Sequence, residues 1–395
     1  MIRSFVRHAR ANGTPYNEPM RLAIVRQRYN PYGGAERFIE RAASALSGRL
    51  SITVYAREWT GAGTAPAVLC APFHIGRLWR DWSFARQVCR KLASATYDLV
   101  QSHERITCCD VYRAGDGVHA AWIERRGRSL GWFGRVTMKF NPYHRYVLAA
   151  EKRLFEGGRL RAVICNSRMV LDEIRTRFAI DEAKLRVVYN GVNLDEFHPR
   201  CSGEHRASGR ARLGIPEASS VYLFVGSGFE RKGVPTLLRA FSRQSDRNAR
   251  LVIVGKDKSL GKMQNLARDL GIFESVHFAG PQKSMQGWYG LADVFVLPTL
   301  YDPFPNAALE ALASGLPVIT TRASGIAEFI KHLENGAICE DPLSVDELTE
   351  CMQAIGPVAG KLSAVSRTTA ERLGIDSMAD QLVALYRELV PEAGI

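Results

Sequence analysis

The chain has 395 residues, a formal net charge of +13 and eight cysteines, and 46% of its residues are hydrophobic. This length predicts two domains of ordinary size, and the composition is typical of soluble globular proteins. No apolar run approaches the roughly 20 residues of a transmembrane helix, and no C-x-x-C pair indicates a zinc or dithiol site. We expect the scattered cysteines to be buried thiols in a reducing compartment, and the positive charge indicates an anionic partner.

The N-terminal part predicts a leader followed by a phosphate-binding type of βα unit. Residues 1–19 are basic and lack the apolar segment of a secretory signal, so we expect a disordered leader. The first domain is predicted over residues 20–195, with a strand at 21–26, after which Gly33 and Gly34 open an amphipathic helix. Such a unit places phosphate at the helix N-terminus, although many glycine pairs only form a tight turn.

A loop-rich run at residues 104–120 contains the first residues of a reactive type. Glycines bracket Asp116 in this run, and His119 follows it. Aspartate and histidine side chains are both suited to proton transfer. The alternative is that Asp116 is a turn residue and His119 a surface residue.

Residues 121–160 differ from the rest of the first domain. This segment has nine basic and three acidic residues, with tryptophan, phenylalanine and tyrosine side chains between them. Basic residues mixed with aromatic ones are typical of a segment that lies on an anionic membrane surface. Nucleic-acid binding and a helical pair with buried aromatic side chains are the alternatives. We expect the membrane surface and no nucleic-acid partner.

The second half repeats the alternation of strands and helices. Residues 200–211 are polar without an apolar period and are predicted to be the interdomain linker. A second domain follows within residues 200–374, and a last amphipathic helix in residues 375–395 is expected to cross back to the first domain. Strands that alternate with helices in both halves predict an α/β protein with two doubly wound sheets.

The stretch from Val294 to Pro317 predicts a binding site. An apolar strand ends at Pro298, a proline-rich turn follows, and a helix runs to a glycine and a proline. Asp302 lies in the turn and Glu310 lies two turns into the helix. Such a turn lies beyond the carboxyl end of a parallel strand, where ligands bind, and the helix start offers N–H groups. The alternative is that Asp302 caps the turn and Glu310 is an exposed helix residue.

Four signals occur in a characteristic order along the chain. They are GGAER after the first strand, NGVNLDEF at the end of the first domain, GSGFERKGV after the first strand of the second domain, and an Asp-x7-Glu pair before ASGLPVI. This order resembles the retaining glycosyltransferases of family 4, with the GT-B fold of two Rossmann-like domains facing each other across a cleft. The resemblance covers about residues 21–390. The run RAGDGVHAAWIERR makes the chain most similar to the lipopolysaccharide-core glucosyltransferase branch.

The resemblance implies a nucleotide-sugar donor, with UDP-glucose as the expected one. Negative charge develops on the leaving diphosphate, so cations must be placed there. Arg231 and Lys232 match the family's diphosphate clamp, in which arginine binds two oxygens and lysine adds a point charge. Gly33 and Gly34 would let the first domain approach the same diphosphate.

The resemblance also implies roles around the donor sugar. Glu310 matches the carboxylate that binds the ribose hydroxyls, and Asp302 falls where the family has a carboxylate near the sugar. Backbone N–H groups of Phe304, Asn306 and Ala307 would face the sugar hydroxyls.

Two positions in this turn depart from the family pattern. Asp302 is one methylene shorter than the usual glutamate. Pro305 stands where many relatives have glycine, and proline has no N–H to donate. Either change could alter which hexose fits.

Asp116 and His119 match the acceptor-side loop of the similar branch, and we expect one of them to orient or deprotonate the acceptor hydroxyl. Because Arg231 and Lys232 meet the phosphate charge, no metal and no cofactor are expected. The expected acceptor is a lipopolysaccharide-core or related cell-envelope glycan or glycolipid, and the protein is expected to be cytoplasmic and peripheral to the inner membrane. A UDP-sugar epimerase of the same fold and a nonenzymatic protein that binds anionic surfaces are the alternatives.

Overall fold

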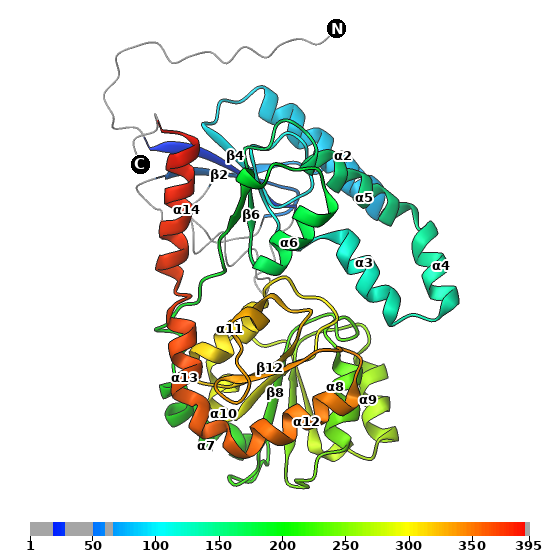
Figure 1. Cartoon of the computed structure of the whole chain (residues 1–395), viewed down its shortest axis with the longest axis vertical. Helices are drawn as coiled ribbons and strands as arrows, with labels where there is room; N and C mark the ends of the chain where they lie inside the picture. The colour runs from blue at the N-terminus through cyan, green and yellow to red at the C-terminus, as the bar shows by residue number, and fades with distance from the viewer. Residues whose placement is uncertain (1–18, 28–49, 60–65, 392–395) are drawn as a thin grey trace.

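The computed structural model of the chain describes residues 19–27, 50–59 and 66–391 (Figure 1). Two α/β domains lie one above the other along the long axis in this view. Gly33, Gly34 and the predicted leader, apart from Pro19, lie outside the described residues.

The first domain contains a parallel sheet of seven strands in the order β3-β2-β1-β4-β5-β6-β7. The chain therefore reverses its direction of travel across the sheet between β1 and β4, which is where open α/β sheets bind ligands. Residues of β1 and β4 are almost all buried, as expected for a parallel sheet that is covered on both faces. The strands are β1 Met20–Val25, β2 Leu50–Ala56, β3 Ala67–Leu69, β4 Leu99–Ser102, β5 Val111–Arg113, β6 Ala162–Cys165 and β7 Leu185–Val187.

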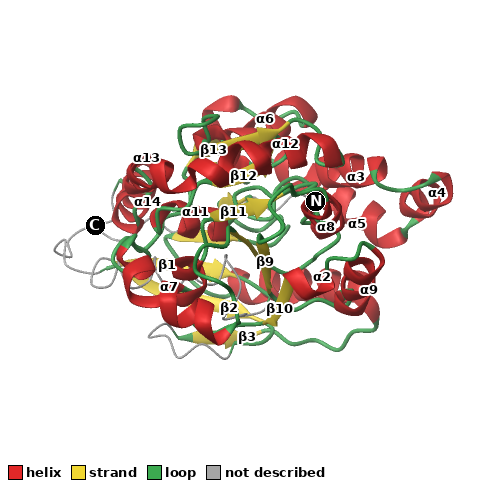
Figure 2. Cartoon of the chain, turned by 90° about the horizontal axis from the view of Figure 1, so that it is seen from below, coloured by secondary structure: helices red, strands yellow, loops and turns green. Residues whose placement is uncertain are grey.

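Five described helices and one 3-10 turn accompany this sheet. Ser167 caps α6, because its side chain accepts a hydrogen bond from the Val170 N–H, and Asn141 caps α5 in the same way through the Tyr143 N–H. Helix α4 projects from the body of the domain in both views (Figures 1 and 2). The elements are α2 Gly76–Ala93, α3 His119–Arg128, α4 Trp132–Phe140, α5 Pro142–Phe155, α6 Arg168–Arg177 and η1 Glu182–Lys184.

The second domain contains a parallel sheet of six strands in the order β10-β9-β8-β11-β12-β13. Its reversal point lies between β8 and β11, so the loops after these two strands meet at one edge of the sheet. The strands are β8 Val221–Val225, β9 Arg250–Val254, β10 Val276–Gly280, β11 Val294–Leu297, β12 Val318–Thr321 and β13 Gly336–Cys339. The α-helices are α7 Arg200–Arg212, α8 Val234–Ser242, α9 Leu260–Asp269, α10 Gln286–Leu291, α11 Asn306–Ala313, α12 Val345–Ile355 and α13 Ala359–Glu371, and the 3-10 turns are η2 Phe273–Ser275, η3 Gly325–Phe329 and η4 Gly356–Val358.

The last helix, α14 (Ile375–Leu389), packs against the first domain rather than the second (Figure 1). Met378, Leu382 and Leu385 lie on one face of the helix and share a core cluster with residues of β1 and β2. The Tyr386 hydroxyl adds a 2.7 Å hydrogen bond to Oε1 of Gln101. Among the described residues, no helix has the length and apolar character needed to cross a membrane.

The prediction of an interdomain linker at residues 200–211 is wrong, because this segment forms helix α7, which packs against α10 within the second domain. The helix packs against α10 through small and charged residues instead of an apolar stripe. Gly209 approaches the Leu291 side chain, and the buried Arg210 forms an ion pair with Asp293 at 2.8 Å. A contact of this kind leaves no apolar period in the sequence.

The expectation that all cysteines are free thiols is wrong for one pair. Cys89 and Cys108 form a disulfide with their Cα atoms 5.7 Å apart, and the other six cysteines are buried and free. The bond joins the C-terminal half of α2 to the loop between β4 and β5. Their separation of 19 residues says nothing about this proximity, which depends on how α2 packs.

Candidate functional site

The loop between β8 and α8 lies closely against the end of β11. Gly233 has φ of +79°, and a Cβ there would lie 1.9 Å from the Pro298 carbonyl oxygen. A Cβ at Gly226 would lie 2.8 Å from Nζ of Lys232. Glycine at these two positions therefore lets the loop reach the turn after β11 and lets Lys232 fold back over it.

Asp257, which sequence analysis missed, braces this loop from the next strand. One of its carboxylate oxygens accepts hydrogen bonds from the N–H groups of Gly228 at 2.7 Å and Phe229 at 3.1 Å. The other accepts the Ser259 hydroxyl at 2.6 Å. Burial alone would raise the pKa of Asp257, but these hydrogen bonds outweigh it and hold the pKa below its usual range.

Three predicted site residues meet where this loop contacts the turn after β11. Oδ2 of Asp302 lies 3.3 Å from Nζ of Lys232 and 3.7 Å from Nη1 of Arg231, and Nη1 of Arg231 donates to the Tyr301 carbonyl at 2.7 Å. Burial lowers the pKa of Lys232, while Asp302 opposes that shift. Two cations and one carboxylate at the end of β11 can receive an anionic ligand that also carries hydroxyl groups.

The helix after the turn, α11, positions the second predicted carboxylate. Glu310 is only 3% exposed, so the alternative of an exposed helix residue is wrong. The Tyr289 hydroxyl lies 3.0 Å from Oε2 of Glu310 and 3.1 Å from the Ala307 carbonyl oxygen. Tyr289 thus fixes both the carboxylate and the first turn of α11.

The start of α11 is tied to the end of the first domain. Nδ2 of Asn190 donates to Oδ1 of Asn306 at 2.6 Å and lies 3.3 Å from the Phe304 carbonyl oxygen. Oδ1 of Asn190 accepts from Arg113 in β5 at 2.6 Å. The predicted sugar-facing residues Phe304, Asn306 and Ala307 therefore lie at a point that both domains hold.

On the side of the first domain, Asp116 lies in a half-exposed position before α3, with 54% of its side chain exposed. Nη1 of Arg26 lies 3.4 Å from its Oδ2 and 3.4 Å from Oε1 of Glu104. Burial of the carboxyl would raise the pKa of Asp116, but the charges of Arg26 and Arg105 lower it below the usual range. Asp116 is therefore ionised at neutral pH.

His119, the first residue of α3, is more enclosed than Asp116. Its backbone N–H donates to Oε1 of Glu151 at 2.7 Å, and its Nε2 lies 3.1 Å from Nδ1 of His144. Burial, helped by Arg105 and His144, lowers the pKa of His119 to about 3. The imidazole is therefore neutral at neutral pH.

The buried Glu151 holds the N-terminus of α3, although sequence analysis counted it only as a charge of the basic segment. It accepts from the N–H groups of His119 and Ala120 and from Nε of Arg105 at 2.9 Å. No local sequence signal marks this residue, because the helix that it caps begins 32 residues before it. Among the described residues, no group of three or more His, Cys, Asp and Glu side chains is placed to hold a metal ion.

The loop 115–118 before α3, predicted to be the acceptor-side loop, touches the turn 298–305 after β11, predicted to be the donor-side turn. Gly117 has φ of +69°, and a Cβ there would lie 2.1 Å from the Tyr301 hydroxyl and 2.7 Å from Cγ of Pro303. The described members of the predicted site therefore form two neighbouring groups, one on each domain.

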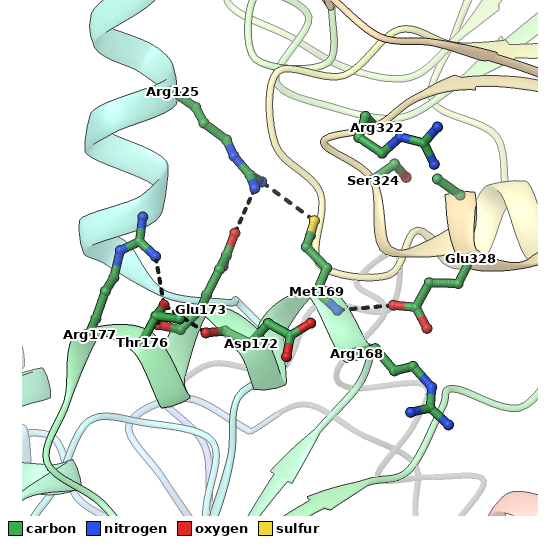
Figure 3. Close-up of a pocket in the computed structure, with 11 residues that line it drawn as sticks. Arg125, Arg168, Met169, Asp172, Glu173, Thr176, Arg177, Arg322, Ser324 and Glu328 are labelled. Carbon is green, nitrogen blue, oxygen red and sulfur yellow. Dashed lines mark hydrogen bonds and ion pairs between the residues drawn. The ribbon is translucent and has the colours of Figure 1, made fainter.

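A cavity of about 470 Å³ lies between α3 and α6 of the first domain and η3 of the second (Figure 3). Arg125 reaches across it to Glu173 at 2.8 Å, and Glu328 accepts from the Met169 N–H at 3.0 Å. None of the predicted site residues that the structure describes lines this cavity.

Comparisons with known proteins agree with the two-domain α/β fold. Residues 32–196 match the model of Glycosyltransferase Family 4, and residues 206–355 match that of Glycosyl transferases group 1. The lipopolysaccharide glucosyltransferase WaaG of Escherichia coli (strain K12) is 26% identical over 341 residues, which are 85% of this chain and 89% of that protein.

Two solved structures share the fold. The crystal structure of WaaG, a glycosyltransferase involved in lipopolysaccharide biosynthesis, superposes with a TM-score of 0.81 at 24% identity, over 92% of this chain and 99% of that one. The crystal structure of Anabaena Alr3699/HepE in complex with UDP-glucose superposes with a TM-score of 0.70 at 17% identity, over 93% of this chain and 100% of that one. The predicted GT-B fold is thus confirmed, and the chain belongs to the glycosyltransferases of the group 1 and family 4 type.

Proposed function

We propose that this glycosyltransferase is a retaining, metal-independent hexosyltransferase that moves glucose from UDP-glucose to a lipopolysaccharide-core or related cell-envelope glycan. The observation that carries this proposal is the convergence of Arg231 and Lys232 on Asp302 at the end of β11. E. coli WaaG is a lipopolysaccharide glucosyltransferase, and HepE binds UDP-glucose in its crystal structure, which supports this donor and this acceptor class.

In the proposed donor complex, the diphosphate lies against Arg231 and Lys232. These cations stabilise the charge that develops on the leaving oxygen, and because they are already held in place, no reorganisation is needed during the reaction. Asp302 and the start of α11 contact the sugar, and Glu310 binds the ribose hydroxyls. Tyr289 keeps the Glu310 carboxylate in one orientation.

Retention follows from attack on the face from which the diphosphate leaves, with a donor phosphate oxygen receiving the acceptor proton. Asp116 is the better placed of the two acceptor-side candidates to orient the acceptor hydroxyl. It is ionised and half-exposed, and it lies close enough to Arg231 for that charge to contribute to its lowered pKa. His119 instead supports the start of α3 through its contact with His144.

We also propose that the protein docks on the anionic cytoplasmic face of the inner membrane. Helix α4 has no buried residue, and Trp132, Phe133 and Phe140 are between 68% and 74% exposed. Exposed apolar area of this kind, flanked by Arg135 and Lys139, fits a lipid interface.

A second exposed apolar group, unnoticed in the sequence, lies near the start of α2. Phe73, Ile75, Trp79 and Trp82 lie just before and within the first turns of α2 and are 40% to 74% exposed. Oδ2 of Asp81 in these turns accepts the Tyr143 hydroxyl of α5 at 3.0 Å, directly after α4. The two groups therefore lie on neighbouring elements and can enter one bilayer surface together.

The proposed reaction is tested by following UDP release from UDP-glucose with a lipopolysaccharide-core acceptor, in the presence of EDTA. We expect release that depends on the acceptor, survives EDTA and gives an α-linked product by NMR. An epimerase would convert the sugar nucleotide without acceptor, and either that result or release that requires added metal contradicts the proposal.

A further inference from the structure

Tyr301 belongs to the donor-side turn by sequence but to the first domain by packing. It directly precedes Asp302, yet the residue is only 2% exposed and belongs to the core cluster of the first domain. Its backbone carbonyl accepts from Arg231 at 2.7 Å. One residue therefore has its main chain in the donor site and its side chain in the opposite domain.

The Tyr301 hydroxyl makes two hydrogen bonds there. It accepts from the N–H of the fully buried Val118 at 2.8 Å and donates to Oε2 of Glu173 in α6 at 2.7 Å. The Val118 N–H belongs to the loop that carries Asp116, directly before α3. The phenol thus joins the acceptor-side loop to α6.

A cation completes this contact. Arg125 lies over the Tyr301 ring, with Cζ 4.8 Å from the ring centre, and its Nη2 forms the 2.8 Å ion pair with Glu173 that Figure 3 shows. Guanidinium groups bind aromatic faces and carboxylates strongly when both partners are shielded from water. Arg125 is therefore part of the interdomain contact, although the sequence places it in the basic segment expected at the membrane.

Glycine at position 117 is required for this arrangement. A Cβ there would overlap the Tyr301 hydroxyl at 2.1 Å, so the loop can close over the phenol only because the side chain is absent. The positive φ of Gly117 points to the same requirement.

We propose that Tyr301, Glu173 and Arg125 form an interdomain clamp that positions the acceptor-side loop 115–118 against the donor-side turn. These three are positioning residues. They act by holding Asp116 and Asp302 in place, and they do not themselves contact the donor or the acceptor. The catalytic part of this inference rests on the proposed function. The clamp keeps the acceptor hydroxyl at a fixed distance from the donor sugar. This distance governs the rate, because reacting groups that are held in the right geometry react much faster.

The clamp is tested without any acceptor by amide hydrogen exchange of residues 115–122. Tyr301→Phe keeps the ring but removes the hydroxyl that accepts from the Val118 N–H, so we expect the exchange rate in this segment to rise about tenfold. Tyr55→Phe is the matched control, because Tyr55 is also a buried tyrosine with a hydrogen-bonded hydroxyl. Its hydroxyl lies 3.1 Å from that of Tyr97, which belongs to the first domain. Unchanged exchange in Tyr301→Phe, or an equal rise in Tyr55→Phe, overturns the clamp.

Kinetics then test the positioning role. In Tyr301→Phe we expect kcat for transfer from UDP-glucose to fall by about ten- to a hundredfold, with the Kd for UDP unchanged. Glu173→Gln keeps an acceptor for the phenol but loses the charge that pairs with Arg125, so its kcat should be intermediate. Wild-type kcat in Tyr301→Phe, or loss of UDP binding along with turnover, contradicts the positioning role. Failure of the wild-type chain to bind UDP instead refutes the proposed function, and the exchange comparison still decides the clamp.

Discussion

Gly233 shows how a single residue holds the proposed donor site together. Its positive φ and its 1.9 Å virtual Cβ contact with the Pro298 carbonyl oxygen bring the loop with Arg231 and Lys232 onto the end of β11. Sequence analysis identified the two cations from their resemblance to a family motif. It could not identify Asp257, which braces the same loop from another strand.

Replacement of Gly233 tests this close approach. We expect Gly233→Ala to lower the free energy of unfolding by about 1–3 kcal/mol, since the backbone strain adds to the overlap with Pro298. Gly214→Ala is the control, because Gly214 also has positive φ but has open space around its Cβ position. Urea unfolding measures both, and equal losses in the two variants would show that the contact with Pro298 contributes nothing.

The lowered pKa of His119 predicts that the free energy of unfolding depends on pH. Its pKa is about 3 in the folded chain against an ordinary value of 6.5, so the unfolded chain binds more protons between these two values. The stability due to neutral His119 is therefore complete above pH 6.5 and is lost as the pH falls toward 3. We expect His119→Asn to lose less stability than the wild type between pH 7.5 and pH 5 in urea unfolding. The exposed His332→Asn is the control, and an unchanged pH dependence in His119→Asn would contradict this account.

At the scale of elements, sequence patterns predicted the long and regular segments well. The 3.6-residue period of α14 and the apolar runs of β8 and β9 are strong signals, because burial of one face or of a whole strand fixes the residue types. The strands β3 and β13 have three and four residues and show no period, so they were missed. Helix α7 was missed because its contact uses glycines and a buried ion pair.

The proposed docking on a membrane predicts that the exposed aromatic residues of α4 contact the lipid. We expect the double variant Trp132→Ser, Phe133→Ser to bind vesicles of anionic lipid about tenfold or more weakly than the wild type. Each substitution removes apolar area that lipid would cover. Binding of the wild type should also weaken as salt is raised. Val365→Ser, at an exposed apolar position on α13, is the control for sedimentation with vesicles. Equal binding by the double variant and the wild type would refute a role for α4.

At the scale of the whole molecule, topology explains why the predicted site residues of the second domain lie together. The Arg231–Lys232 pair follows β8, and Asp302 and Glu310 follow β11. These two strands lie at the reversal point of the second sheet, where ligands are expected. The contacts between the domains could not be placed in this way. Tyr301 and Glu173 are 128 residues apart, and neither their spacing nor their type shows that they meet.

The central claim is that the second domain binds a uridine nucleotide between Glu310 and the two cations, and thermal unfolding tests it most directly. With UDP at one hundred times its Kd and EDTA present, we expect stabilisation of about 2.7 kcal/mol in the wild type. Glu310→Ala should abolish the shift, whereas Glu350→Ala, at an exposed position on α12, should retain it. Absence of any shift with UDP near millimolar concentration, or an equal shift in Glu310→Ala, would contradict the account.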